Sequence, residues 1–339
     1  MTDAEIGKIT LKAMQKRHAE LKKSVHCTPV VDLQAPAVTE VLGGGSMTLK
    51  LECFQQTGTF KARGALSNIQ AIPNQKRAHG ITAASAGNHA IAAAWAAKAA
   101  GLSAKVVMQN NANPIRIERA CAQGSEVILR DPGMATFNEA KRLAQDEGRT
   151  FIHPFDGVDT VLGTAGVGLE LMTQIRDLDA VVVSVGGGGL ISGVAAAVKL
   201  LNPACKVYGV EPEGAAAMSR SLSIGAPVTI ESVDTIADSL GPPMAMALGH
   251  AMCATYVDQI VTVSDDAICA GMVVLQQDAK LAVEPAAGAA MAGALGPLRK
   301  DLQGKRIGIV VCGANIDAVT YAQQINRGAA HLQELLQTP

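Results

Sequence analysis

Short apolar segments alternate with longer mixed segments along most of the chain. The apolar segments are rich in Val, Ile and Ala, which is typical of strands in a buried sheet. We predict strands at Ile81–Ala84, Ala104–Met108, Ser125–Leu129, Thr150–His153, Ala180–Val185, Lys206–Val210, Gln259–Val263 and Arg306–Val311. Ala-rich or amphipathic segments separate most of them and favour helices. This repeated strand–helix–strand order predicts an α/β fold with mostly parallel sheets flanked by helices.

The strand–helix units fall into two groups that can be separated near Gly148–Pro154. Before the first unit, Ile6–Leu21 has helical spacing, and Thr48–Glu52 alternates after a glycine loop. We therefore predict a large domain of residues 1–52 and 149–339 and a small domain of residues 53–148. Ligands of such sheets bind at the carboxyl ends of the strands, often between domains.

Composition narrows the function classes. Of 339 residues, 48% are hydrophobic and 17% are charged, with a net charge of −1, which excludes a disordered chain and argues against nucleic-acid binding. No apolar run is long enough to span a membrane, and residues 1–24 lack the apolar core of a signal peptide. The seven cysteines contain no Cys-x-x-Cys pair. We expect a reduced, cytoplasmic protein that binds neither nucleic acid nor membrane.

The most specific motif is a strand that runs into Gly186, Gly187, Gly188 and Gly189 and then into a helical segment. Without side chains, adjacent backbone amides can surround an anion, and the helix N-terminus adds its positive dipole. A dinucleotide site requires G-x-G-x-x-G, which this spacing does not satisfy, although Glu211 lies where a ribose-binding acid would. A single phosphate fits better than a dinucleotide, and a plain turn is the alternative.

A second loop, Ser85-Ala86-Gly87-Asn88-His89, follows a predicted strand and precedes an Ala-rich helix. Ser85 or Asn88 can cap that helix, and the loop amides suit a carboxylate. A serine hydrolase is disfavoured because Ala83 replaces the first glycine of G-x-S-x-G and no triad partners are evident.

Two further segments carry candidate chemistry. Lys61 follows the aromatic Phe60 in a turn that leads into a helix, so it is a candidate amine nucleophile, with a solvated surface lysine as the alternative. Cys312 directly follows the last predicted strand and precedes Gly313 and Asn315, and by itself it would be interpreted as a buried apolar residue.

Together and in this order, the four segments resemble the fold type II family of pyridoxal 5'-phosphate (PLP) enzymes, the tryptophan synthase β-like fold. Within it they are similar to the threonine and serine dehydratases (ammonia-lyases) and serine racemase. The resemblance runs from Thr28 to Asn315 and implies two open, mostly parallel sheets, PLP as cofactor, an amino acid substrate and a homodimer or homotetramer.

The resemblance also implies roles for individual residues. Lys61 is the lysine that links to the cofactor and acts on the substrate, with Phe60 beside it. Asn88 holds the 3'-oxygen, Gly186–Gly189 hold the phosphate, and Cys312 faces the pyridine nitrogen. The loop that binds the substrate carboxylate consists of Ser85, Ala86, Gly87, Asn88 and His89. Some relatives bind a divalent ion through an acid at Glu211 and another six residues later, but that position is Ala217, so we assign no metal.

The predicted reaction is PLP-dependent β-elimination of water from an L-3-hydroxy amino acid, L-threonine or L-serine, which yields a 2-keto acid and ammonia. A serine or hydroxyaspartate racemase, another β-eliminase, and a β-replacing enzyme on the same fold are the nearest alternatives. A nucleotide-binding dehydrogenase or a non-catalytic sensor is the alternative from a different class. Thr59, Ile91 and residues 163–166 depart from the family pattern near the substrate pocket, so the side chain preferred stays open.

Elimination is predicted to prevail over racemisation. In the racemase pattern a serine in the carboxylate loop acts on the side opposite the lysine, and this chain has Ala86 there. A methyl group carries no proton to exchange. A neutral Cys312 at the pyridine nitrogen also limits the lifetime of the carbanion, which favours prompt loss of the β-hydroxyl.

Overall fold

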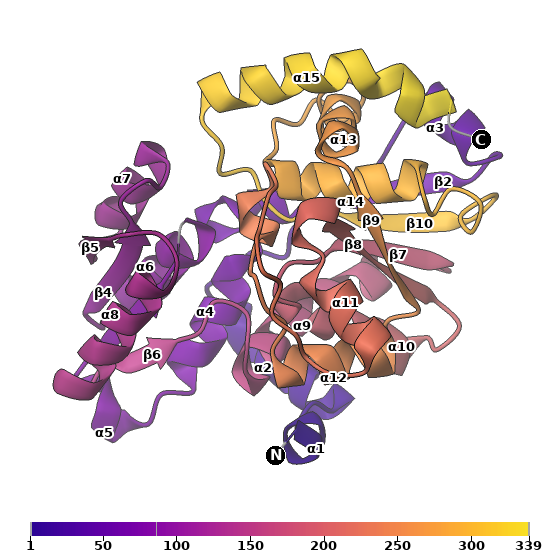
Figure 1. The fold of residues 1–339 in the computed structure, drawn as a ribbon. Helices are drawn as coiled ribbons and strands as arrows, with labels where there is room; N and C mark the ends of the chain where they lie inside the picture. The colour runs from indigo at the N-terminus through magenta and orange to yellow at the C-terminus, as the bar shows by residue number, and fades with distance from the viewer. Residues whose placement is uncertain (1, 86, 338–339) are drawn as a thin grey trace.

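The computed structural model describes residues 2–85 and 87–337, and it contains two separate sheets (Figure 1). The strands of the larger sheet are, in spatial order, β1 (Val30–Asp32), β2 (Ser46–Lys50), β10 (Arg306–Val310), β7 (Ala180–Ser184), β8 (Lys206–Pro212) and β9 (Gln259–Val263). The strands of the smaller sheet are β5 (Glu126–Arg130), β4 (Ala104–Gln109), β3 (Ile81–Ala84) and β6 (Thr150–Ile152). All pairs are parallel except β1 with β2, which confirms the predicted fold class.

Helices cover both faces of each sheet. Around the larger sheet lie α2 (Leu11–Leu21), α3 (Pro36–Val41), α9 (Val158–Gln174), α10 (Gly189–Leu201), α11 (Ala217–Ile224), α12 (Ala247–Tyr256), α13 (Asp265–Gln277), α14 (Pro285–Leu295) and α15 (Ala318–Gln337). Around the smaller sheet lie α4 (Lys61–Gln70), α5 (Asn74–Arg77), α6 (Asn88–Ala99), α7 (Pro114–Ala122) and α8 (Met134–Asp146). The remaining short elements are α1 (Thr2–Ile6), η1 (Glu52–Phe54), η2 (Gln56–Gly58), η3 (Glu213–Ala215) and η4 (Asp238–Leu240).

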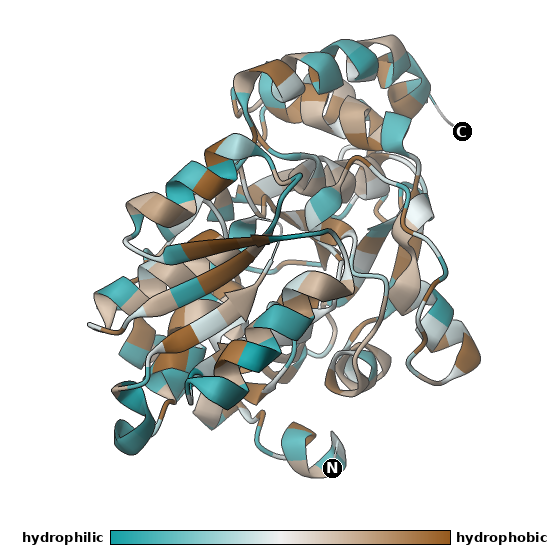
Figure 2. Ribbon diagram, turned by 60° about the vertical axis from the view of Figure 1, so that its left-hand side comes forward, coloured by the Kyte–Doolittle hydropathy of each residue, from teal (hydrophilic) through white to brown (hydrophobic). Residues whose placement is uncertain are grey.

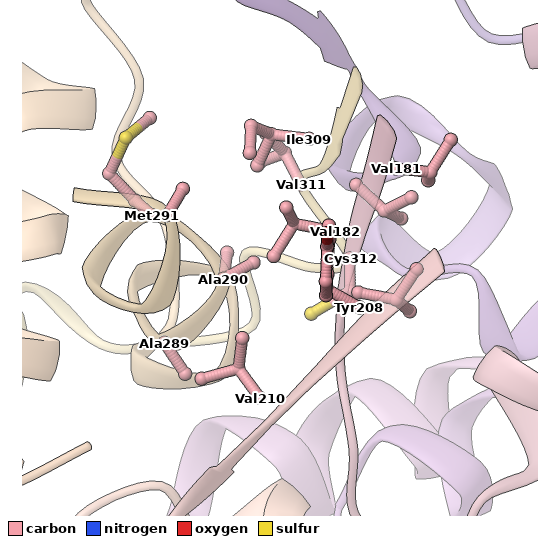
Figure 3. Packing of buried hydrophobic residues seen from close by; sticks show 14 of the residues in the cluster. Val181, Val182, Tyr208, Val210, Ala289, Ala290, Met291, Ile309, Val311 and Cys312 are labelled. Carbon is pink, nitrogen blue, oxygen red and sulfur yellow. The ribbon is translucent and has the colours of Figure 1, made fainter. Parts of the chain in front are cut away.

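The core of the larger unit is built from small apolar side chains, as the low aromatic content requires. All residues of α14 are buried, and this helix lies between the sheet and α13, with α15 outside (Figure 1). Ala289 and Ala290 of α14 face Val210 and Val182 of the strands (Figure 3). A methyl group added at Gly288 would lie 2.5 Å from the carbonyl oxygen of Ile268, so α13 and α14 approach backbone to backbone.

Hydropathy follows this layering. Figure 2 shows brown along the strands and mixed teal and brown on the outer helices, as expected for helices that bury one face. No helix in the described part of the chain combines the length and apolarity that a membrane crossing requires.

The single helix predicted over Ile6–Leu21 is wrong in its first part. The structure has α1 ending at Ile6 and α2 beginning at Leu11, where the hydroxyl of Thr10 accepts a hydrogen bond from the amide of Ala13. Ile6 and Ile9 still pack against the same apolar cluster as α2, so the periodicity continues across the break and hides it.

The predicted division into two domains stays a prediction, with one change that we propose. Strand β6 pairs with β3 in the smaller sheet, with Ile81 opposite Thr150, although the predicted small domain ends at residue 148. We propose that the second boundary lies after β6. The sequence offered no signal for this, because a short apolar strand between two groups of units can join either sheet.

A buried cluster of four charged side chains ties α4 to the larger unit. Arg63 of α4 donates to both carboxylate oxygens of Glu52 and of Glu170, all at 2.8 Å. The ammonium of Lys50 donates to Glu170 at 2.6 Å and to the carbonyl of Thr28 at 2.7 Å. Two cations and two anions are thus paired away from water, and their helices and strands are fixed relative to one another.

Replacing Arg63 with methionine should therefore lower the unfolding free energy of the protein substantially. The buried carboxylates of Glu52 and Glu170 would lose a partner, which costs about 3–5 kcal/mol of unfolding free energy in comparable buried pairs. The measurement is chemical denaturation of both proteins. Arg306→Met, at an exposed ion pair with Asp179, is the matched control and should cost much less. Equal losses in the two variants would contradict the prediction.

Candidate active site

One cavity lies where segments from both sheets converge. The carboxyl ends of β3, β7 and β10 and the start of α4 all contribute to it, as expected for parallel sheets. Its lining includes Lys61, Asn88, the four glycines Gly186–Gly189, Ser239, Glu284 and Cys312. The structure thus brings together the glycine loop, the lysine, the asparagine and the cysteine that the sequence singled out from distant segments.

Lys61 begins α4 and is half-buried against this cavity. The preceding turn is held to the end of β10, because the amide of Phe60 donates to the carbonyl of Cys312 at 3.1 Å. The amine of Lys61 donates to the carbonyl of Pro154 at 2.7 Å and lies 5.1 Å from the centre of the Phe60 ring. Burial lowers the pKa of Lys61 to about 8, against the opposing effect of Cys312 and Glu284. A solvated surface lysine, the alternative interpretation, does not describe this side chain.

The glycine loop follows β7 and opens α10. Gly188 has a left-handed backbone conformation with φ of 87°, which glycine adopts most readily. A methyl group added at Gly187 would lie 2.2 Å from the ring of Phe155, and one at Gly189 would lie 2.5 Å from its carbonyl oxygen. The amides of Gly187, Gly188 and Gly189 donate to no other group within the described chain. The loop therefore presents free donors at a helix N-terminus, which is an anion-binding arrangement.

Asn88, at the start of α6, belongs to a buried hydrogen-bond chain. Its amide nitrogen donates to both carboxylate oxygens of Glu284, at 2.8 and 2.9 Å, and its oxygen accepts from Asn315 at 2.8 Å. Glu284 precedes Pro285 at the N-terminus of α14, where the helix dipole favours a negative charge. Burial nevertheless raises the pKa of Glu284, while Arg116 acts in the opposite direction.

The predicted carboxylate loop is described at four of its five positions, and Ala86 lies outside the described residues. The hydroxyl of Ser85 accepts from the amide of Gly87 at 3.0 Å and so organises the loop. The capping hypothesis is wrong, because Gly87 is the N-cap of α6 and no side chain caps this helix. His89 is buried, with Nε2 2.9 Å from the carbonyl oxygen of Ile152. Burial lowers the pKa of His89 to about 3, so its ring is neutral and joins the loop to β6.

Arg116 of α7 was not among the predicted residues, yet it lies directly behind this loop. A methyl group added at Gly87 would lie 2.6 Å from Cδ of Arg116. The buried guanidinium pairs with Asp238, donates to the carbonyl of Asn315 at 3.1 Å, and lies 3.8 Å from Glu284. One side chain thus connects the smaller sheet's helix layer to three segments of the larger unit.

Cys312 is buried at the end of β10, beneath α14 (Figure 3). Burial raises the pKa of the Cys312 thiol well above its ordinary value, and the nearby Glu284 raises it further. The side chain therefore stays a neutral thiol in the cavity.

Glu211 has a structural explanation. Its carboxylate accepts from the amides of Met218 and Ser219, both at 2.8 Å, and so caps the start of α11. This bonding leaves no role as a ribose-binding acid. Within residues 2–85 and 87–337, no group of three or more His, Cys, Asp or Glu side chains is arranged to hold a metal ion.

Ser239 and Glu284 line the cavity but were not among the predicted site residues. A glutamate directly before Pro285 and an apolar helix is a usable signal for a helix N-terminus. Ser239 sits in an irregular segment between predicted strands, where a serine is ordinary. Only the tertiary structure brings its hydroxyl to the cavity.

Comparison with known proteins agrees with this geometry. A family model described as pyridoxal-phosphate dependent enzyme matches residues 21–313. The chain belongs to that family. It is 46% identical to a phenylserine dehydratase of Ralstonia pickettii, over 94% of this chain and 97% of the relative. It is also 36% identical to an L-threonine ammonia-lyase of Thermotoga maritima, over 94% of this chain and 79% of the relative.

Solved structures support the same conclusion. The structure of maize serine racemase superimposes with a TM-score of 0.88 at 33% identity and covers 95% of this chain and 98% of its own. The predicted family, fold class and cofactor are therefore confirmed. The predicted oligomer stays a prediction.

The cavity of this PLP enzyme is chemically suited to the cofactor. It offers one primary amine with a lowered pKa, a row of free amides at a helix N-terminus, and a neutral thiol at the opposite strand end. These groups match an aldehyde, a phosphate and a pyridine nitrogen respectively.

Lys61 should make the stability of the cofactor-free protein depend on pH. The unfolded chain holds this proton up to the ordinary pKa of 10.5, whereas the folded protein releases it near 8. Between these values the unfolded state binds more protons, so the unfolding free energy rises with pH. The difference in unfolding free energy between the unaltered protein and Lys61→Met should therefore rise from pH 8 to 10.5 and stay constant below pH 8. A difference independent of pH, measured by denaturation, would contradict this.

Proposed function

We propose that this PLP enzyme is an ammonia-lyase that removes water from an L-3-hydroxy amino acid and releases a 2-keto acid and ammonia. The observation that carries the proposal is a Lys61 amine with a pKa of about 8 in the same cavity as the glycine loop and the Asn88 loop. The relatives named phenylserine dehydratase and L-threonine ammonia-lyase support it. L-threonine, L-serine and L-phenylserine are the substrates to test.

The cofactor would be held by four groups of this chain. Lys61 would attach to its aldehyde, and the amides of Gly186–Gly189 would bind its phosphate at the start of α10. Asn88 would face the 3'-oxygen and Cys312 the pyridine nitrogen. Phe60, adjacent to Lys61, would pack beside it.

The chemistry that PLP supplies when bound is delocalisation of the negative charge that forms on the substrate α-carbon. Lys61, once freed from the cofactor, removes the α-proton as general base, and a pKa near 8 suits that role near neutral pH. The amides around Gly87 bind the substrate carboxylate, with the guanidinium of Arg116 behind them. The neutral thiol of Cys312 gives the pyridine nitrogen no charged partner, which favours loss of the β-hydroxyl over a persistent carbanion.

Lys61 should be the lysine that holds the cofactor. Borohydride treatment of the holoenzyme, followed by peptide mapping, should place the reduced adduct on Lys61 and not on the buried Lys50. Lys61→Ala should fold but release keto acid from L-serine, L-threonine or L-phenylserine at least about 100-fold more slowly, since it lacks the general base. An adduct elsewhere would overturn the assignment.

Analysis of the products of this reaction distinguishes elimination from racemisation. Chiral chromatography of a partly consumed L-serine or L-threonine reaction, beside a keto-acid assay, should show that keto-acid release outpaces inversion at the α-carbon. If inversion is the faster process in the unaltered protein, the dehydratase assignment is wrong.

Gly188→Val should weaken PLP binding about tenfold or more, because the loop must leave its left-handed conformation and shift its amides. The added Cβ would also lie 2.7 Å from the methyl group of Met218. Gly225→Val is the matched control, since Gly225 has a similar φ of 79°, nothing within 4 Å of an added Cβ, and no place in the cavity. Equal PLP affinity in the two variants, measured by fluorescence titration, would show that the loop is only a turn.

A further inference from the structure

The glycine loop has two sides, and Lys61 lies on one of them. Gly187 and Gly189 face Phe155, as the 2.2 and 2.5 Å approaches of their added methyl groups show. Phe155 directly follows Pro154, whose carbonyl accepts the hydrogen bond from the amine of Lys61. Gly187 and Gly189 therefore pack against the segment of Pro154 and Phe155, which Lys61 also contacts.

The other side is covered by η4. A methyl group added at Gly186 would lie 3.1 Å from Cα of Leu240 and 3.2 Å from the carbonyl oxygen of Ser239. Ser239 lines the same cavity as Lys61. Ser239 therefore lines the cavity from η4, on the side of the loop that Gly186 faces.

Ser239 has a hydrogen-bond partner in Glu284. Its hydroxyl is 3.5 Å from a carboxylate oxygen of Glu284, which Asn88 holds in place. The charged and titratable groups that interact with Glu284 are Arg116 at 3.8 Å, Asp238, Lys61, Cys312 and Cys53. Burial raises the pKa of Glu284, so its carboxyl group can carry a proton more readily than an exposed one.

We propose that Ser239, supported by Glu284, is the second acid–base group of this site and acts on the substrate α-carbon from the side opposite Lys61. The proposal rests on the proposed function, since both concern the same α-proton. It predicts that slow inversion of the L-substrate to its D-isomer accompanies elimination. Ala86 has no hydroxyl at the position of the racemase serine, and Ser239 supplies one from η4.

The proton balance of the inversion is complete without a further reactant. The Lys61 amine takes the α-proton of the L-isomer, and the hydroxyl of Ser239 gives its proton to the opposite side of the α-carbon. The carboxyl group of Glu284 returns a proton to the Ser239 oxygen. Lys61 then loses its proton to water and Glu284 regains one from water, so no electrons are transferred and only the configuration changes. Ser239 is the catalytic residue in this step, and Glu284 is a positioning residue that acts through it.

The test compares Ser239→Ala, Ser239→Cys and Ser232→Ala in the holoenzyme, with L-serine and L-threonine in deuterated water. Ser239→Ala should lower the ratio of α-deuterated D-isomer to keto acid by about 100-fold or more. Ser239→Cys, which keeps a protic group, should restore part of the inversion. Ser232, an exposed serine in the same segment, should be replaceable without effect on either product.

A second readout needs neither cofactor nor turnover. Infrared spectra of the cofactor-free protein should contain carboxyl bands that Glu284→Gln removes and that Ser239→Ala shifts, because the hydroxyl bonds to that carboxylate. Unshifted bands would show that the pair does not exist in solution and would overturn the proposal.

The product assays give separate answers for the two proposals. Keto acid without any D-isomer from the unaltered protein, or D-isomer that persists in Ser239→Ala, would overturn the role of Ser239 and leave the ammonia-lyase intact. Equal loss of both products in Ser239→Ala would show a structural role and would also overturn it. Absence of keto acid from the unaltered protein would overturn the proposed function, while the inversion assay still decides the role of Ser239.

Discussion

The buried pairing of Arg63 with Glu52 and Glu170 is the constraint on which the site depends. Arg63 lies two residues after Lys61 in the first turn of α4. Fixing the Arg63 guanidinium therefore also fixes the start of this helix and the Lys61 amine. Lys50 completes the cluster from the end of β2, and its neighbour β10 carries Cys312. The cluster thus locks the lysine to the sheet that supplies the rest of the cavity. Four buried charges are costly to desolvate, and they are tolerated because every carboxylate oxygen has a donor.

A second polar network borders the site. Arg116 touches Gly87 in the predicted carboxylate loop and pairs with Asp238, beside Ser239. Glu284 receives Asn88 and lies near both Arg116 and Ser239. A carboxylate that arrives at the loop would therefore enter a field set by one guanidinium and two acids. The pKa of Glu284 depends on that field, because Arg116 lowers it and Asp238 raises it.

In the glycine loop, close packing and anion binding both require glycine at the same four positions. Each of the four glycines has a neighbour that an added Cβ would approach within 3.1 Å, so none can be replaced without displacement. The same close packing leaves the backbone amides facing the cavity at the start of α10. The absence of side chains therefore serves the fold and the anion site together, and composition alone does not separate the two causes.

The sequence by itself determined the strands that pair in parallel and the identity of the lysine, glycine and cysteine segments, but it did not reveal β1, the antiparallel edge strand. These features are encoded locally, by apolar runs and by motifs whose spacing matches a known family. The break between α1 and α2, the membership of β6 in the smaller sheet, and the helix-capping role of Glu211 were decided by tertiary contacts. Ser239 and Arg116 entered the site for the same reason: an ordinary serine and an ordinary arginine become chemically distinct only when folding removes water from them and places a carboxylate at each one. Contacts between residues more than a hundred positions apart along the chain, such as Arg116 with Asp238, leave no local pattern by which a single sequence reveals them.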